Sequence, residues 1–168
     1  AMVEKQAVRE KEAEIGFNPY EDALKRSIEK KEKARKGARI IKGKEIAWLV
    51  GRQGVLRYYH TESLQGHALD TLRLFVHEIR THSGRHVHQG GFLLLVLKGK
   101  GYTVVDGIRF DWSEGDLILL PFKKGGVEHQ HFNMDNKPSR WLAFSSIPVG
   151  DMVGHFLEQK ENYQGFKG

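Results

Sequence analysis

The spacing of apolar residues changes from helical to extended near residue 38. Before that point, apolar residues recur at every fourth position, which places them on one face of a helix: Tyr20, Leu24 and Ile28. Asn18 is a favourable helix cap, Pro19 suits the first helical position, and Gly37 is typical of a helix stop. The pattern predicts a helix across residues 19–36, preceded by a short helix rich in Glu, Lys and Ala within residues 3–15.

After residue 38, short β-prone runs alternate with glycine-rich turns. The runs cover residues 40–41, 46–50, 55–59, 72–81, 92–97, 102–105, 108–112, 117–121 and 140–147. Asp106-Gly107 is a strong two-residue hairpin signal. The run at 92–97 is almost wholly apolar, as expected of a strand that is buried on both faces. Many short strands at this spacing predict an antiparallel barrel or sandwich.

Two histidine clusters lie within the β-prone region. The first contains His86 and His88, which point to the same side of a strand because successive side chains alternate. The second contains His129 and His131. If His129 returns to that side from a later strand, three imidazoles converge, and three neutral imidazoles form a transition-metal site. His131 is then either a proton-transferring or hydrogen-bonding neighbour of the site, or the third ligand in place of His129.

The residues around these clusters resemble the two motifs of the cupin superfamily. In the first motif, His86, His88 and Gly99 match, while Phe92 stands where the motif has a carboxylate. The second motif is matched by four residues, with a longer loop before the histidine: Gly115, Pro121, His129 and Asn133. The spacing to Asn133 favours His129 over His131 as the ligand. The resemblance implies a mainly β fold, a cupin double-stranded β-helix (jelly-roll) barrel that holds one metal.

Within cupins, the chain is similar to the gentisate 1,2-dioxygenase group of ring-cleaving enzymes. The similarity rests on the run Gly-Lys-Gly-Tyr-Thr-Val-Val-Asp-Gly at residues 99–107 and on His-Gln-His-Phe-Asn at 129–133. That group also lacks the motif carboxylate and binds iron through three histidines. This chain has room for one cupin domain where those enzymes have two, and it carries Leu94 where they usually place a substrate-binding arginine.

The resemblance implies Fe(II) bound by His86, His88 and His129, although Mn, Ni, Cu and Zn also suit imidazole ligands. Without a carboxylate ligand, both charges of a divalent ion stay uncompensated, which favours an anionic and bidentate organic ligand. The expected function is a dioxygenase that acts with O2 on a small aromatic or oxygen-rich organic acid. The alternatives are a non-oxidative isomerase or lyase acting on a sugar or keto acid, and a non-catalytic small-molecule-binding barrel.

Two further residues near the clusters are candidates for the site. Strict alternation places Arg80 in phase with His86 and His88, so it could anchor a substrate carboxylate inside the cavity. With His131, it forms the expected set of catalytic residues. His82 lies in the turn before the first cluster and is a weaker candidate.

The chain divides into three expected segments. Residues 1–37 form a charged helical extension, 38–148 the cupin barrel, and 149–168 a C-terminal helix and tail in which Asp151 caps the helix and Phe156 and Leu157 lie on its apolar face. We expect the long helix to lie across the barrel or a partner subunit, and the protein to be a homodimer.

Charge and composition narrow the function classes. Residues 1–44 hold 13 Lys and Arg against 8 Asp and Glu, which accounts for most of the net charge of +6. Because these charges alternate in sign without interleaved aromatics, they indicate a solvated helix face and no nucleic-acid partner. The absence of cysteine excludes thiolate ligands. No signal peptide or membrane-length apolar run is present, so we expect a cytoplasmic protein with no membrane partner.

Overall fold

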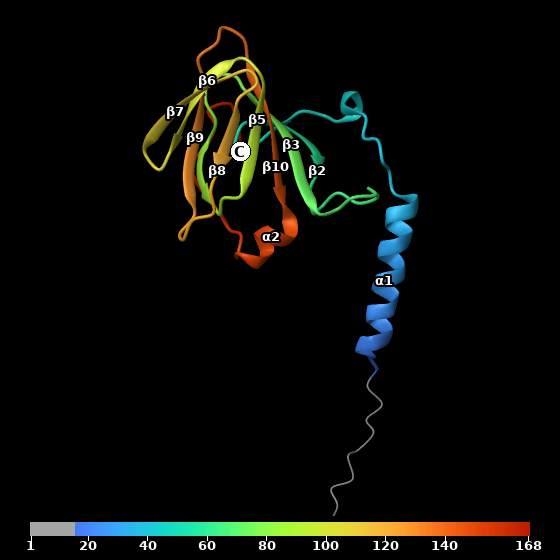
Figure 1. Ribbon diagram of the computed structural model, residues 1–168. Coiled ribbons are helices and arrows are strands. Elements are labelled where there is room, and N and C mark those ends of the chain that lie inside the picture. Colours follow the sequence, from blue (N-terminus) through green and yellow to red (C-terminus); the bar gives the residue numbers. More distant parts are fainter. Residues whose placement is uncertain (1–15) are drawn as a thin grey trace, which may run out of the picture.

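Two antiparallel sheets face each other and enclose the core (Figure 1) in the computed structural model, which describes residues 16–168. The six-stranded sheet contains, in spatial order, β1 (Leu49–Val50), β2 (Val55–His60), β3 (Leu72–Ile79), β10 (Ser139–Ser146), β5 (Phe92–Lys98) and β8 (Leu117–Leu120). The five-stranded sheet contains β11 (Leu157–Glu161), β4 (Arg85–His88), β9 (Val127–Asn133), β6 (Lys100–Val105) and β7 (Ile108–Ser113). This arrangement confirms the predicted double-stranded barrel.

The inner faces of the sheets supply the core through simple alternation. On β10, Trp141 and Ala143 are buried, while Arg140, which alternates with them, is exposed. On β3, Phe75 packs edge-on against Phe92 of β5, with ring centroids 6.4 Å apart. The predicted hairpin at Asp106-Gly107 is also confirmed, because both residues have positive φ and join β6 to β7.

Strand β5 is buried on one face only, so the expectation of burial on both faces is wrong. Leu94 and Val96 lie in the core, whereas Leu95 and Leu97 are exposed on the outer face. An unbroken apolar run carries no alternation, so it cannot reveal that one face of this sheet is uncovered. Leu117 and Leu119 of β8 extend the same exposed surface. The expected homodimer stays a prediction.

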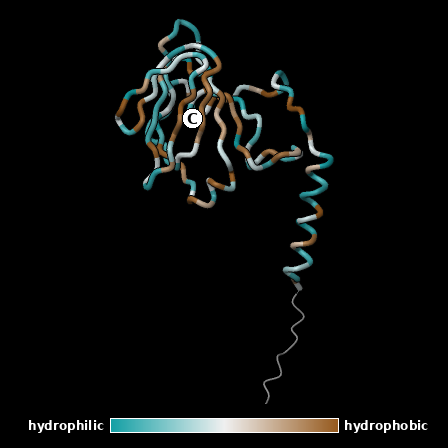
Figure 2. The backbone as a smooth tube through the Cα atoms, in the orientation of Figure 1, coloured by the Kyte–Doolittle hydropathy of each residue, from teal (hydrophilic) through white to brown (hydrophobic). Residues whose placement is uncertain are grey.

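The helix α1 (Pro19–Lys36) confirms the predicted bounds, with the Asn18 side chain accepting hydrogen bonds from the backbone of residues 20 and 21. The helix does not lie across the barrel, whereas docking on a partner subunit stays a prediction. The helix projects away from the barrel (Figure 1), none of its residues is buried, and most of its length is hydrophilic (Figure 2). Its C-terminal end contacts the barrel through Lys33, which pairs with Asp70 at 2.6 Å. The short helix expected within residues 3–15 lies outside the described residues.

Both ends of the barrel differ from the predicted elements. Residues 40–41 and 46–48 are not strands, and a short 3-10 helix, η1 (Gly43–Glu45), lies between them. Helix α2 (Ile147–Met152) begins before Asp151, because Ser146 caps it and Pro148 suits its first turn. Phe156 and Leu157 therefore fall outside the helix. Leu157 begins β11, which pairs with β4 and forms one edge of the five-stranded sheet.

No helix within residues 16–168 is both long enough and apolar enough to span a membrane.

The barrel interior contains polar side chains that sequence patterns would place on a surface. His77 on β3 is 2% exposed, and its ring lies edge-on to Trp141 with centroids 4.8 Å apart. The His77 Nε2 atom has no hydrogen-bond partner within the described part of the chain. Burial lowers the pKa of His77 to about 3, so the imidazole is neutral at physiological pH.

We expect His77 to make stability depend on pH in the acid range. In the unfolded chain its pKa is about 6.5, so between that pH and about 3 the unfolded state binds more protons than the native state. The contribution of His77 to the free energy of unfolding is complete above the unfolded pKa. It is lost by about 1.4 kcal/mol per pH unit as the pH falls. Between pH 6.5 and about 3, the free energy of unfolding measured in urea should fall less steeply with pH in the His77→Phe variant than in wild type, by this amount per pH unit. Equal slopes in the two proteins would contradict this account. The difference in the free energy of unfolding between the two proteins at pH 8, where His77 is neutral in both states, measures the effect of the substitution on packing alone.

Candidate metal centre

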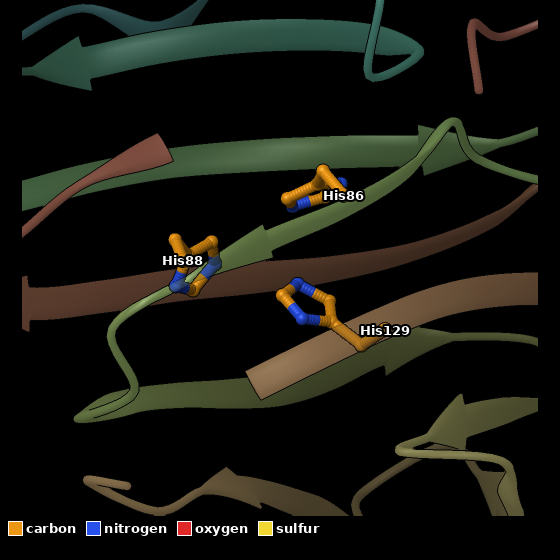
Figure 3. Close-up of side chains that lie close together, drawn as sticks. All are labelled: His86, His88 and His129. Carbon is orange, nitrogen blue, oxygen red and sulfur yellow. The ribbon is translucent and has the colours of Figure 1, made fainter. Parts of the chain in front are cut away.

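His86, His88 and His129 converge because β4 and β9 are paired in register. His86 and His88 project from the same face of β4, and His129 on β9 lies directly opposite His86 (Figure 3). The ring of His129 is 4.3 Å from that of His86 and 4.6 Å from that of His88, measured between centroids. One nitrogen from each of the three rings lies within 4.8 Å of the other two. The predicted convergence of three imidazoles is therefore present.

The backbone around each ring favours the tautomer that a metal needs. In each histidine, Nδ1 faces the carbonyl oxygen of a residue one or two positions away, at 3.3 Å for His86, 2.6 Å for His88 and 3.1 Å for His129. Because a carbonyl only accepts, these contacts place the ring proton on Nδ1. The lone pair of each Nε2 then points away from the backbone, as in metal-bound histidines, and a metal at His86 would displace the Gln53 amide nitrogen that lies 3.3 Å from Nε2.

Burial keeps the three rings neutral. Removal from water lowers the pKa of His86 to about 4 and of His88 to about 3, and it holds the pKa of His129 well below its usual value. Neutral imidazoles are competent ligands at pH 7. No Asp or Glu is among the described residues that line the cavity, and the Phe92 ring lies 4.6 Å from that of His88. The donor set therefore fits a divalent transition metal held by nitrogen atoms alone.

The three histidines open into a cavity of about 230 Å³. Its walls are mainly aromatic and aliphatic: Tyr58, Phe75, Phe92, Leu94, Leu120 and Trp141. Ligand pockets in proteins commonly measure about 300–1,000 Å³, so this cavity suits a small molecule. The turn after His88 requires glycine, because Gly91 has a φ of +80° and a Cβ on Gly90 would lie 1.7 Å from the Pro121 carbonyl oxygen.

His131 lines the same cavity but is held differently from the three other rings. Trp112 Nε1 donates to Thr103 Oγ1 at 2.9 Å, and that hydroxyl lies 2.8 Å from His131 Nδ1. An indole nitrogen only donates, so the Thr103 oxygen accepts from it and has its own hydrogen available for His131 Nδ1. The proton of His131 is then on Nε2. This arrangement favours His129 as the third ligand and gives His131 a hydrogen to donate.

Arg80 does not reach the cavity, so its expected role as an interior anchor is wrong. Its side chain is half exposed and pairs with Glu78 at 3.0 Å on the outer side of the barrel. The strand β3 ends at Ile79, and a turn separates it from β4, so alternation cannot be counted from His86 back to residue 80. His82 also lies outside the cavity lining, with its Nδ1 2.9 Å from the Ser83 carbonyl oxygen.

The cavity contains polar residues that sequence reasoning missed. Arg73 alternates in phase with Phe75 and His77 on β3, but the all-apolar opposite set of Leu72, Leu74 and Val76 is the face that alternation would bury, so the pattern did not reveal it. Gln53, whose amide nitrogen is 3.3 Å from His86 Nε2, lies in the turn before β2, where no periodicity could reveal it. His155 follows α2 and lies 5.8 Å from His88 between ring centroids.

Comparison with known protein sequences finds one family model and two curated relatives that match parts of the barrel. Residues 74–145 match the family described as Cupin domain. The chain is 37% identical to a gentisate 1,2-dioxygenase from Ralstonia sp over 65 residues, which cover 38% of this chain and 18% of that enzyme. It is 26% identical to a 5-aminosalicylate 1,2-dioxygenase from Comamonas sp over 108 residues, which cover 63% of this chain and 28% of that enzyme. The chain thus spans less than a third of the length of either relative.

Comparison with solved structures supports the fold. A mutant of the salicylate 1,2-dioxygenase from Pseudoaminobacter salicylatoxidans in complex with gentisate aligns with 97% of this chain and 52% of its own, at a TM-score of 0.54 and 19% identity. The polyketide cyclase RemF from Streptomyces resistomycificus aligns with 78% of this chain and 87% of its own, at a TM-score of 0.52 and 15% identity. At these identities the likeness concerns the fold alone. The barrel of this chain therefore has the cupin fold, with residues 74–145 matching the Cupin domain family, and it resembles the barrels of the gentisate and salicylate dioxygenases.

Proposed function

We propose that this chain is a metal-dependent dioxygenase that binds Fe(II) through His86, His88 and His129 and acts with O2 on a small aromatic or oxygen-rich organic acid. The observation that carries the proposal is a buried cluster of three neutral imidazoles in a small cavity with no carboxylate on its walls. Such a donor set leaves the charge of a divalent ion uncompensated, which favours an anionic ligand. The names of the two sequence relatives support the same reaction class.

The proposed reaction needs open metal positions, a surface that contacts the substrate and a proton donor. A bound Fe(II) would supply open coordination positions for O2 and for substrate oxygens. The aromatic side chains of Phe75, Phe92 and Trp141 exclude water and offer flat surfaces for a planar substrate. His131, held by Thr103, presents a proton on Nε2 for donation to a substrate oxygen.

We expect about one Fe(II) per chain when the protein is prepared with iron under anaerobic conditions. His86→Ala and His129→Ala should each lose stoichiometric iron and with it iron-dependent oxygen uptake on gentisate or a related phenolic acid, because two imidazoles leave the site incomplete. Elemental analysis and an oxygen electrode measure the two quantities.

His67→Ala is the matched control for loss of a histidine, because His67 lies in a loop outside the cavity, beside His60. Iron content equal to wild type in the His86 and His129 variants would contradict the proposed site. Stoichiometric iron with no oxygen uptake across a panel of phenolic acids would contradict the dioxygenase reaction.

We expect the His131→Gln variant to keep its iron and to lose turnover. General acid–base groups commonly contribute about 100-fold to 10,000-fold in rate, so oxygen uptake should fall by at least the lower of these factors. Thr103→Val, which removes the hydrogen bond to His131 Nδ1, should give a smaller loss at unchanged iron content. Loss of iron from His131→Gln would instead make His131 a ligand.

A further inference from the structure

One permanent positive charge lies on the cavity wall. Of the described residues that line the cavity, Arg73 is the only Arg or Lys, and none is Asp or Glu. Arg73 is on β3 in phase with Phe75 and His77, so the strand itself directs the side chain inward. The side chain is 18% exposed, which places the charge at the edge of the cavity with little access to solvent.

The guanidinium of Arg73 is held in place but keeps donors available. Within residues 16–168 its hydrogen bonds run to Glu62 alone, from Nε to Oε2 at 3.3 Å and from Nη2 to Oε1. A guanidinium has five N–H groups, so at least three remain, including both on Nη1. Glu62 lies in the loop after β2 and is itself partly exposed, so it anchors Arg73 from the solvent side.

Arg73 and the histidine cluster both lie near the Phe92 ring. The guanidinium carbon lies 5.8 Å from the centroid of the Phe92 ring, and that ring lies 4.6 Å from the His88 ring. The guanidinium and the His88 ring thus both lie beside the same aromatic side chain. A molecule that lies along Phe92 could place one end at Arg73 and the other at the three histidines.

We propose that Arg73 is the anion-binding residue of the cavity and that it receives the carboxylate of a small planar organic acid through its Nη1 and Nη2 donors. The identification of that acid as the substrate rests on the proposed dioxygenase function. Sequence alternation had assigned this anion contact to Arg80, which lies outside the cavity. Leu94 also lines the cavity and offers no charge, so the anion contact falls to Arg73.

The chemistry of arginine supports this assignment. A guanidinium is planar and always charged, and its paired N–H groups match the two oxygens of a carboxylate. Glu62 already fixes the orientation of the group, so binding costs less rotamer freedom than an unrestrained side chain would lose. Arg73 is largely shielded from solvent, so its attraction for an anion is screened less than at the surface, while Glu62 and Asp151 offset part of its charge.

Binding of benzoate and of neutral benzamide to the full chain, supplied with Zn(II), tests the proposal by calorimetry without any turnover. Benzoate and benzamide differ in charge but hardly in shape, and neither carries a ring hydroxyl. Wild type should prefer benzoate. Arg73→Gln should weaken benzoate binding by about 10-fold to 100-fold, as expected for loss of a charge-assisted hydrogen bond, and leave benzamide within about twofold. Arg73→Lys retains the charge without the planar pair of N–H groups, so its affinity for benzoate should lie between those of wild type and Arg73→Gln.

Arg80→Gln is the matched control, because it removes an ion-paired arginine near the end of the same strand outside the cavity, and it should bind both probes like wild type. Equal weakening of benzoate and benzamide by Arg73→Gln would overturn the proposal and make Arg73 a structural residue. A benzoate preference that persists in both Arg73 variants, or is absent from wild type, would overturn it as well. The result is separable from the dioxygenase proposal: loss of the preference in Arg73→Gln supports the anion contact even if no phenolic acid drives oxygen uptake.

Discussion

The pairing of β4 with β9 is the constraint on which the site depends. His86 opposes His129 across this ladder, and a slip of one residue would turn His129 to the outer face and bring Glu128 or Gln130 into the barrel. Several contacts hold the register. Ser83 donates its backbone N–H to the His131 carbonyl oxygen and accepts from the His131 backbone through Oγ, and β11 pairs with the other edge of β4. The strand that carries two of the three histidines is thus fixed on both sides.

Burial of so many imidazoles has an electrostatic consequence. Each histidine of the cluster is neutral, each Nδ1 faces a backbone carbonyl, and no acid lines the described cavity. The barrel therefore offers a metal ion nitrogen ligands without any negative charge. A bound divalent ion would keep its positive charge, which under the proposed function attracts an anionic ligand together with Arg73. A 2-His-1-carboxylate site would lack much of this attraction.

The sequence was sufficient for the features that rest on short-range rules. Alternation placed His86 and His88 on one face, the Asp-Gly pair located the β6–β7 hairpin, and Asn18 marked the start of α1. The sequence was not sufficient where contacts between distant segments determine which residues lie inside the barrel. Arg80 was assigned to the interior because alternation was counted through a turn, whereas Arg73 on the unbroken strand was inside. Leu157 was assigned to a helix, although its pairing with His88 of β4 makes it the first residue of a strand.

The exposed apolar stripe of α1 shows a further limit of pattern reasoning. Tyr20, Leu24 and Ile28 lie on one helix face as predicted, and yet that face covers nothing within the described chain. Periodicity reports that a helix has an apolar side but not where the helix docks. The same holds for β5, whose outer leucines are exposed.

X-ray absorption spectroscopy of the iron-loaded protein tests the central claim most directly, because it reports the atoms that surround the metal. The account predicts one iron site whose protein ligands are three imidazole nitrogens, with the outer-shell scattering typical of histidine rings and the remaining positions filled by water oxygens. A shell of oxygen atoms without imidazole scattering would contradict it, because the iron would then be bound away from His86, His88 and His129.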